Sequence, residues 1–147
     1  MTPPEQELNT LAAKAAVTAS LLNIGSYIAQ ISVALLMLGL LLLWLLGHSV
    51  SHPLLLAAMA MALLQVYFAL RVRFDANIFR TWANRWHGSA DPKADLNAFD
   101  KQVGRSVAAT DIKTDLSNRR AGALRLLRLQ LICMVMQLLM TAVAVWF

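Results

Sequence analysis

Two histidines, His48 and His52, stand four residues apart, a spacing that can place two imidazoles on one face of a helix for a metal ion. Two ligands do not complete a site, and the neighbouring Gly47 and Pro53 are typical of a turn between helices. The third histidine, His87, falls on the opposite side of the membrane in the topology derived below. We therefore expect no metal ion, haem or other cofactor, and we interpret the pair as part of a hydrated loop.

The acidic residues do not form a catalytic pattern. After Glu7 all the acidic residues of the chain are aspartates, namely Asp75, Asp91, Asp95, Asp100, Asp111 and Asp115. Acid–base or phosphoryl-transfer catalysis needs such groups to converge on one pocket, whereas Asp91 and Asp95 fit the first turn of a short helix. The sequence has no phosphate loop, nucleophile elbow or metalloprotease motif, and its single cysteine, Cys133, excludes an internal disulfide. These features favour a non-enzymatic function.

Arginine and aromatic side chains alternate in the segment 71–128. The residues that could contact a partner or lipid are Arg71, Arg73, Arg80, Trp82, Arg85, Trp86, Arg119, Arg120, Arg125 and Arg128. They have three interpretations: topology signals, contacts with anionic lipid, or contacts with nucleic acid. The first needs no further assumption, and lipid contact comes second. Nucleic-acid binding is disfavoured, because these residues lie at the height of the lipid headgroups and nearby aspartates dilute the basic surface.

The elements that position these residues follow from composition. The chain has 147 residues, of which 59% are hydrophobic and 14% charged, against about 25% charged in soluble domains. Its mean hydropathy is +0.58. Because about 20 helical residues cross a bilayer core, the charge-free stretch 15–70 is long enough for two crossings, and 129–147 for one. We predict crossings at 28–46, 53–70 and 129–146, the first two joined by a tight hairpin.

The cations predict the orientation. Twelve of the 13 lie in 71–128 and none lies in the hairpin. Short loops rich in Lys and Arg stay in the cytoplasm, so we expect an inner-membrane protein with a cytoplasmic N-terminus and an outside C-terminus. Trp44 and Trp146 are then expected as anchors at the outer interface, and Trp82 and Trp86 at the inner one.

Four regions follow: an N-terminal helix (1–27), a transmembrane hairpin (28–70), a basic cytoplasmic loop (71–128) and a third crossing (129–147). The N-terminal region begins with a capping box, Thr2-Pro3-Pro4-Glu5, and its apolar residues recur at helical spacing. We predict a separate amphipathic helix. It could pack against protein, which we favour, or lie in the lipid interface.

The basic loop is predicted to contain short helices. The second crossing continues past the membrane and ends near Gly88, since apolar residues keep their helical spacing up to that point. Asp91-Pro92 and Gly104 are typical of the two ends of a short helix, whose apolar face is formed by Leu96, Phe99 and Val103. We predict a loop over 105–118. Asp115 or Ser117 would cap the last helix.

The crossings contain no ionisable residue, which argues against ion-coupled transport. Their amide side chains are Gln30, Gln65, Gln130 and Gln137. We predict that these pack the helices together, and that Gln30, Gln65 and Gln130, near the inner edge, hydrogen-bond with one another.

The sequence thus predicts an all-α integral membrane protein with three transmembrane helices, an N-terminal amphipathic helix and a helical cytoplasmic loop. The function that we favour is a non-enzymatic accessory, assembly or scaffold subunit of an inner-membrane complex, in contact with membrane lipid and with a membrane-protein partner or further copies of itself. The alternative is a small lipid-modifying enzyme, or a lipid-binding or transport protein, that uses the basic cytoplasmic rim.

Overall fold

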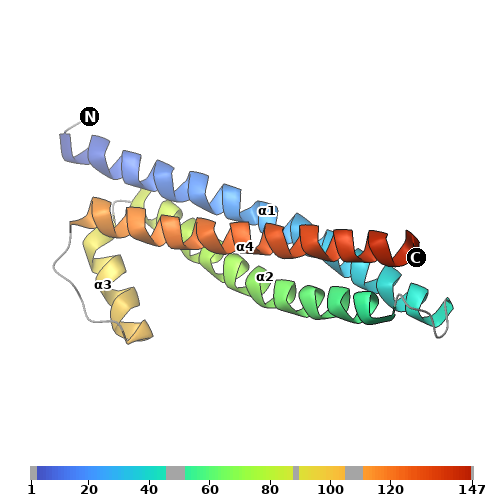
Figure 1. Ribbon diagram of the computed structural model, residues 1–147. Helices are drawn as coiled ribbons and strands as arrows, with labels where there is room; N and C mark the ends of the chain where they lie inside the picture. Colours follow the sequence, from blue (N-terminus) through green and yellow to red (C-terminus); the bar gives the residue numbers. More distant parts are fainter. Residues whose placement is uncertain (1–2, 46–51, 88–89, 105–110, 147) are drawn as a thin grey trace.

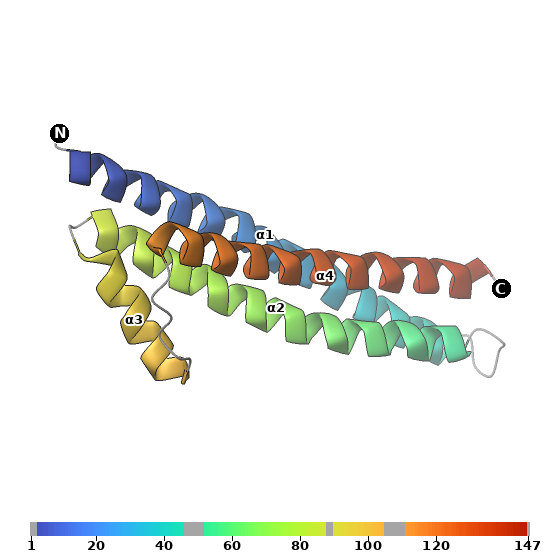
Figure 2. The same cartoon turned by 60° about the vertical axis from the view of Figure 1, so that its left-hand side comes forward.

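The protein is all-α. A computed structural model describes residues 3–45, 52–87, 90–104 and 111–146. Its helices are α1 (Pro3–Leu45), α2 (His52–His87), α3 (Pro92–Val103) and α4 (Ile112–Trp146). The three long helices lie side by side, and the short α3 projects from one end of them (Figures 1 and 2). Each long helix is apolar and long enough to cross a membrane.

Helix length shows that the bundle extends well past a bilayer. At 1.5 Å per residue, the 43 residues of α1 span about 65 Å, roughly twice the hydrocarbon core. The charges gather in what we name the charged half, which comprises 3–24 of α1, 71–87 of α2, all of α3 and 112–128 of α4. The remainder, without any Asp, Glu, Lys or Arg, is the span half, made of 25–45, 52–70 and 129–146.

The predicted ends of the short helix are confirmed. The Asp91 carboxylate accepts a hydrogen bond from the Lys93 N–H, and Pro92 opens α3. Gly104 closes the helix in the left-handed region, at φ 72°, a conformation that glycine adopts without strain. The continuation of the second crossing is also confirmed, since α2 runs to His87.

The sequence predicted a separate N-terminal helix, and this prediction is wrong. α1 continues without a break through the predicted boundary at residues 27 and 28. Gly25, near this boundary, lies inside the continuous helix, at a point where α2 and α4 contact α1. A Cβ there would lie 2.8 Å from Val72 Cγ1 and 2.9 Å from Gln130 Oε1, so the missing side chain lets α2 and α4 approach α1.

The prediction of a loop over 105–118 is wrong for its second part, while 105–110 lies outside the described residues. α4 begins at Ile112, and its buried Leu116 packs in the core of the charged half. Asp115 therefore lies inside the first turns of α4 and does not cap it. Ile112 and Leu116 pack against this core. These contacts stabilise the first turns of α4, although the segment contains few large apolar residues.

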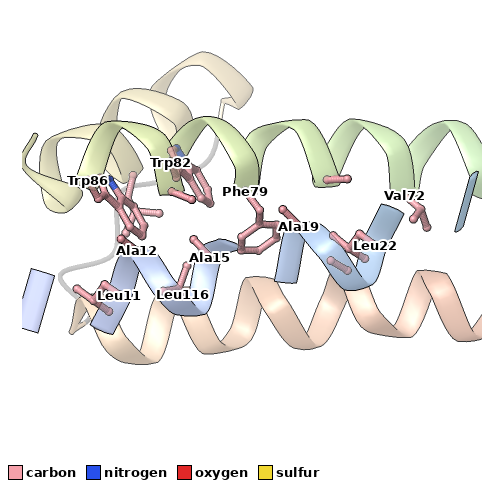
Figure 3. Close-up of a cluster of buried hydrophobic side chains, with 14 residues drawn as sticks. Leu11, Ala12, Ala15, Ala19, Leu22, Val72, Phe79, Trp82, Trp86 and Leu116 are labelled. Carbon is pink, nitrogen blue, oxygen red and sulfur yellow. The ribbon is translucent and has the colours of Figure 1, made fainter. Parts of the chain in front are cut away.

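The core of the charged half is aromatic. Its buried apolar residues are Leu11, Ala12, Ala15, Ala19, Leu22, Val72, Ala76, Phe79, Trp82, Ala83, Trp86, Leu96, Leu116 and Ala123 (Figure 3). Trp82 and Trp86 stack with ring centroids 5.8 Å apart. They are only 6% and 1% exposed, so the expectation that they anchor the membrane interface is wrong. By contrast, Trp44 and Trp146, in the span half, are 80% and 87% exposed.

Candidate functional site

Buried polar contacts fix α3 to the bundle. The Trp86 indole donates to Asp95 Oδ2 at 3.2 Å, and Arg85 pairs with Asp95 Oδ1 at 2.8 Å. Further along α3, Asp100 accepts from Arg119 Nη2 at 2.6 Å. Asp95 thus ties α3 to α2, and Asp100 ties it to α4. The sequence, in which Asp95 fits the first turn of a short helix, did not indicate these partners of Asp95 and Asp100.

Arg119 lies at the centre of this arrangement. Besides Asp100, its guanidinium contacts Asp115 at 3.0 Å and lies 5.8 Å from the Trp82 ring centroid and 5.4 Å from that of Phe99. Burial by itself lowers the pKa of Arg119, but its hydrogen bonds to Asp100 and Asp115 outweigh burial, so the pKa is raised. Arg119 is therefore a cation held inside the protein, which leaves little of it for a partner or a lipid.

The other predicted contact residues divide by exposure. Arg71, Arg73, Arg80, Arg85, Arg125 and Arg128 are exposed, Arg120 is half-buried, and Trp82 and Trp86 are buried. The structure does not bring these residues together as one surface. It covers the tryptophans with other helices of the same chain and leaves most of the arginines around the rim of the charged half.

A groove opens between α2, α3 and α4 where α3 leaves the bundle. Its volume is about 630 Å³, and its lining residues are Arg71, Phe74, Asp75, Ile78, Phe79, Trp82, Phe99, Val103, Asp115, Asn118, Arg119, Gly122, Ala123 and Leu126. Phe74 and Val103 are 50% and 53% exposed there. A Cβ added to Gly122 would meet nothing within 4 Å, so the space above this residue is open. This groove is a candidate binding site.

Three buried glutamines join the helices in the span half. Gln65 donates to the Ile28 carbonyl at 3.1 Å, and Gln130 donates to the Gly25 carbonyl at 2.7 Å. Gln137 donates to the Ser32 carbonyl at 3.0 Å and accepts from the Ser32 hydroxyl. We call Gln65, Gln130 and Gln137 the glutamine seam. All three bond to α1, from α2 or α4.

Gln30 does not join the seam. It lies on the exposed surface of α1, so the predicted cluster of Gln30, Gln65 and Gln130 does not form. The seam side chains bond to α1 through its backbone carbonyls, with Ser32 the side-chain partner of Gln137. The sequence gives the position of each glutamine along its helix. In a helix that is apolar on all sides, however, the sequence does not show which face contacts a neighbouring helix.

The two described histidines lie at opposite ends of α2. His52 begins α2 and His87 ends it, while His48 lies outside the described residues. In the part of the chain that the structure describes, no group of three or more His, Cys, Asp or Glu side chains is arranged to hold a metal ion.

No protein-family model, curated protein or solved structure matches this chain. The groove is an open site near the end of the spans, and the glutamine seam is a closed structural contact between them.

Proposed function

We propose that this chain is a non-enzymatic accessory, assembly or scaffold subunit of an inner-membrane protein complex, and that it holds a helix of a membrane-protein partner in the groove between α2, α3 and α4. The observation that carries the proposal is the groove itself. Its volume of about 630 Å³ lies in the range of ordinary binding pockets. Its lining combines apolar side chains with charged groups of both signs.

The lining favours a helix with one apolar face. Phe74, Ile78 and Val103 offer apolar contacts, and the open space above Gly122 allows close approach of a backbone. The charged residues that line the groove have both signs, Arg71 and Arg119 with Asp75 and Asp115, and Arg119 is already paired with Asp115. The exposed Arg71 is the cation of this lining that a partner can contact.

The orientation is part of the proposal. Arg71 directly follows the charge-free stretch of α2, which puts the groove at the inner edge of the membrane if the cation-rich half is cytoplasmic. A partner's transmembrane helix, or an amphipathic helix lying on the membrane, can reach the groove from the side at this height. Trp82 contributes to the groove's lining from inside the core, and Trp86 acts by fixing α3.

One observation favours the alternative of lipid binding. Exposed apolar side chains run along α2 from the span half toward the groove: Leu63 and Leu70 are 67% and 65% exposed, and Phe74 is 50% exposed. This surface is continuous with the groove, so an acyl chain could enter it from the bilayer.

The test is a photoreactive amino acid placed at Val103 in the full chain, in native membranes. Capture of one defined membrane protein supports the scaffold proposal, provided that Gly122→Leu removes the adduct by filling the groove. Leucine is a better helix former than glycine, and a Cβ added at this exposed position meets nothing within 4 Å, so the substitution is compatible with the fold. Ala34→Leu, at an exposed position of α1 in the span half, is the control and should leave the adduct unchanged.

Two outcomes would contradict this proposal. A lipid adduct without a protein adduct, removed by Gly122→Leu, would favour the lipid-binding alternative. A protein adduct that persists in Gly122→Leu would show that the partner sits elsewhere.

A further inference from the structure

A second, smaller pocket lies between α1 and α4 in the charged half, on contacts separate from the groove. Its volume is about 80 Å³, room for a few water molecules or one small polyatomic ion. Three cationic side chains converge on it, Lys14 from α1 and Lys113 and Arg120 from α4. Ser117 lines the same pocket and carries a hydroxyl donor.

The cations of this pocket are only partly balanced. Lys113 pairs with Glu7 at 2.5 Å, and both side chains are more than half exposed. Arg120 Nε is buried and has no hydrogen-bond partner among the described residues. A buried donor without an acceptor is costly, and a guanidinium in that state calls for an oxygen atom that the described residues do not provide.

The distance of the pocket from the bilayer indicates whether such an oxygen comes from a lipid headgroup or from a soluble molecule. Gln130 bonds to Gly25, so these two residues mark one level, at the start of the span half. Lys14 precedes Gly25 by eleven residues and Arg120 precedes Gln130 by ten, which puts the Cα atoms of these two pocket residues about 15 to 17 Å from that level along the helices. The polar layer of a bilayer is only about 5 to 8 Å thick on each side. The pocket therefore lies beyond the headgroups.

We propose that this pocket binds a phosphate-type oxyanion from solution: inorganic phosphate, or the phosphoryl group of a soluble molecule. The Arg120 guanidinium and the Lys14 and Lys113 ammonium groups supply positive charge and N–H donors, and Ser117 adds a hydroxyl. Glu7 competes with the ligand, because it holds Lys113 and adds a negative charge beside the pocket.

The test uses the full chain in phosphatidylcholine nanodiscs, with inorganic phosphate titrated against chloride at constant ionic strength and thermal unfolding as the readout. Ligand that binds only the folded state raises the melting temperature in a saturable way. Lys14→Gln and Arg120→Gln should each weaken phosphate binding about tenfold, and Glu7→Gln should tighten it by about threefold. Lys93→Gln, which removes an exposed cation from α3, is the matched control and should bind as the wild type does.

The opposite results would overturn the proposal. These are a wild-type response to phosphate no different from that to chloride, or Lys14→Gln binding phosphate as tightly as the wild type. If Arg120→Gln fails to fold, Lys14→Gln decides, since Lys14 is exposed and tolerates replacement. A second arm adds phosphatidylglycerol to the nanodiscs. Phosphate binding that is unchanged by phosphatidylglycerol supports a soluble ligand. If phosphatidylglycerol abolishes phosphate binding, the pocket binds a lipid headgroup and the proposal of a soluble ligand is wrong.

Discussion

The two halves of the bundle are stabilised by different side chains. The charged half buries its large apolar residues, among them Phe79 and Trp86, which are 3% and 1% exposed. The span half does the reverse. Many of its large apolar residues face outward, with Leu63 at 67% and Met37 at 60% exposed, while its polar Gln65 is fully buried.

This difference is the one expected if the span half lies in lipid and the charged half in water. In water, removing apolar surface from solvent drives packing, so the largest side chains go inside. In lipid the same side chains gain little by facing each other, so close contact of small residues and hydrogen bonds between helices must hold the bundle. Gly25 and the glutamine seam are therefore the counterparts, in the span half, of the stacked tryptophans in the charged half.

The first prediction tests whether the halves lie where this comparison needs them, and its expected effect is all or none. In a Cys133→Ala background, a cysteine at Ala94, exposed on α3, should be shielded from an impermeant thiol reagent in intact cells. A cysteine at Ser49, outside the described residues, should be labelled. The reversed pattern would invert the proposed orientation, and labelling at both positions would contradict the assignment of the spans.

The second prediction concerns the aromatic core. Trp86→Ala should lower the free energy of unfolding by about 3 to 5 kcal/mol, because it leaves a cavity and removes the hydrogen bond to Asp95. The measurement is denaturant unfolding in detergent. Trp146→Ala, at a site 87% exposed, is the control and should change stability little. If both variants lose the same free energy of unfolding, the burial of large apolar side chains is not what stabilises the charged half.

The third prediction addresses the glutamine seam. Gln65→Leu should lower the free energy of unfolding by about 0.5 to 2 kcal/mol, since its hydrogen bond to the Ile28 carbonyl is lost, while membrane insertion stays intact. Gln30→Leu, on the exposed surface of α1, is the matched control and should have little effect. A thermal unfolding series in detergent compares the two. Should Gln30→Leu cost as much as Gln65→Leu, the seam is not what holds the span half.

The smallest expected effect is that of the exposed pair between Glu7 and Lys113. The hydrogen bond and charge of Lys113 lower the pKa of Glu7 below 4.5, and those of Glu7 raise the pKa of Lys113 above 10.5. The stabilisation is thus present between these values, lost as pH falls through the lowered pKa of Glu7, and lost as pH rises through the raised pKa of Lys113. The melting temperatures of wild type and Glu7→Gln should differ slightly at neutral pH and converge in acid. A difference that persists in strong acid would exclude this pair as its cause.

The sequence predicted the elements that depend on local chemistry. Charge-free length gave three apolar helices that could span a membrane, and Asp91, Pro92 and Gly104 marked both ends of α3 correctly. These predictions succeeded because caps, proline and left-handed glycine act within a few residues of one another.

The errors arose where the outcome depends on what packs against an element. The spacing of Trp82 and Trp86 correctly put them on one face, since they stack, but it could not show that other helices of the chain cover that face. The groove depends on the angle at which α3 leaves the bundle, which the contacts of Asp95 and Asp100 fix across long sequence separations. No pattern within α3 encodes that angle.

The continuity of α1 has a mechanical consequence. Since one uninterrupted helix runs from Pro3 to Leu45, and α2 likewise runs from His52 to His87, neither has a joint at the level where the charges begin. A helix whose hydrophobic length does not match its bilayer responds by tilting. If the span half lies in a bilayer, its tilt is carried along the same helices to the end of the bundle where α3 lies (Figure 2). The position of α3 relative to such a membrane then follows the bilayer thickness.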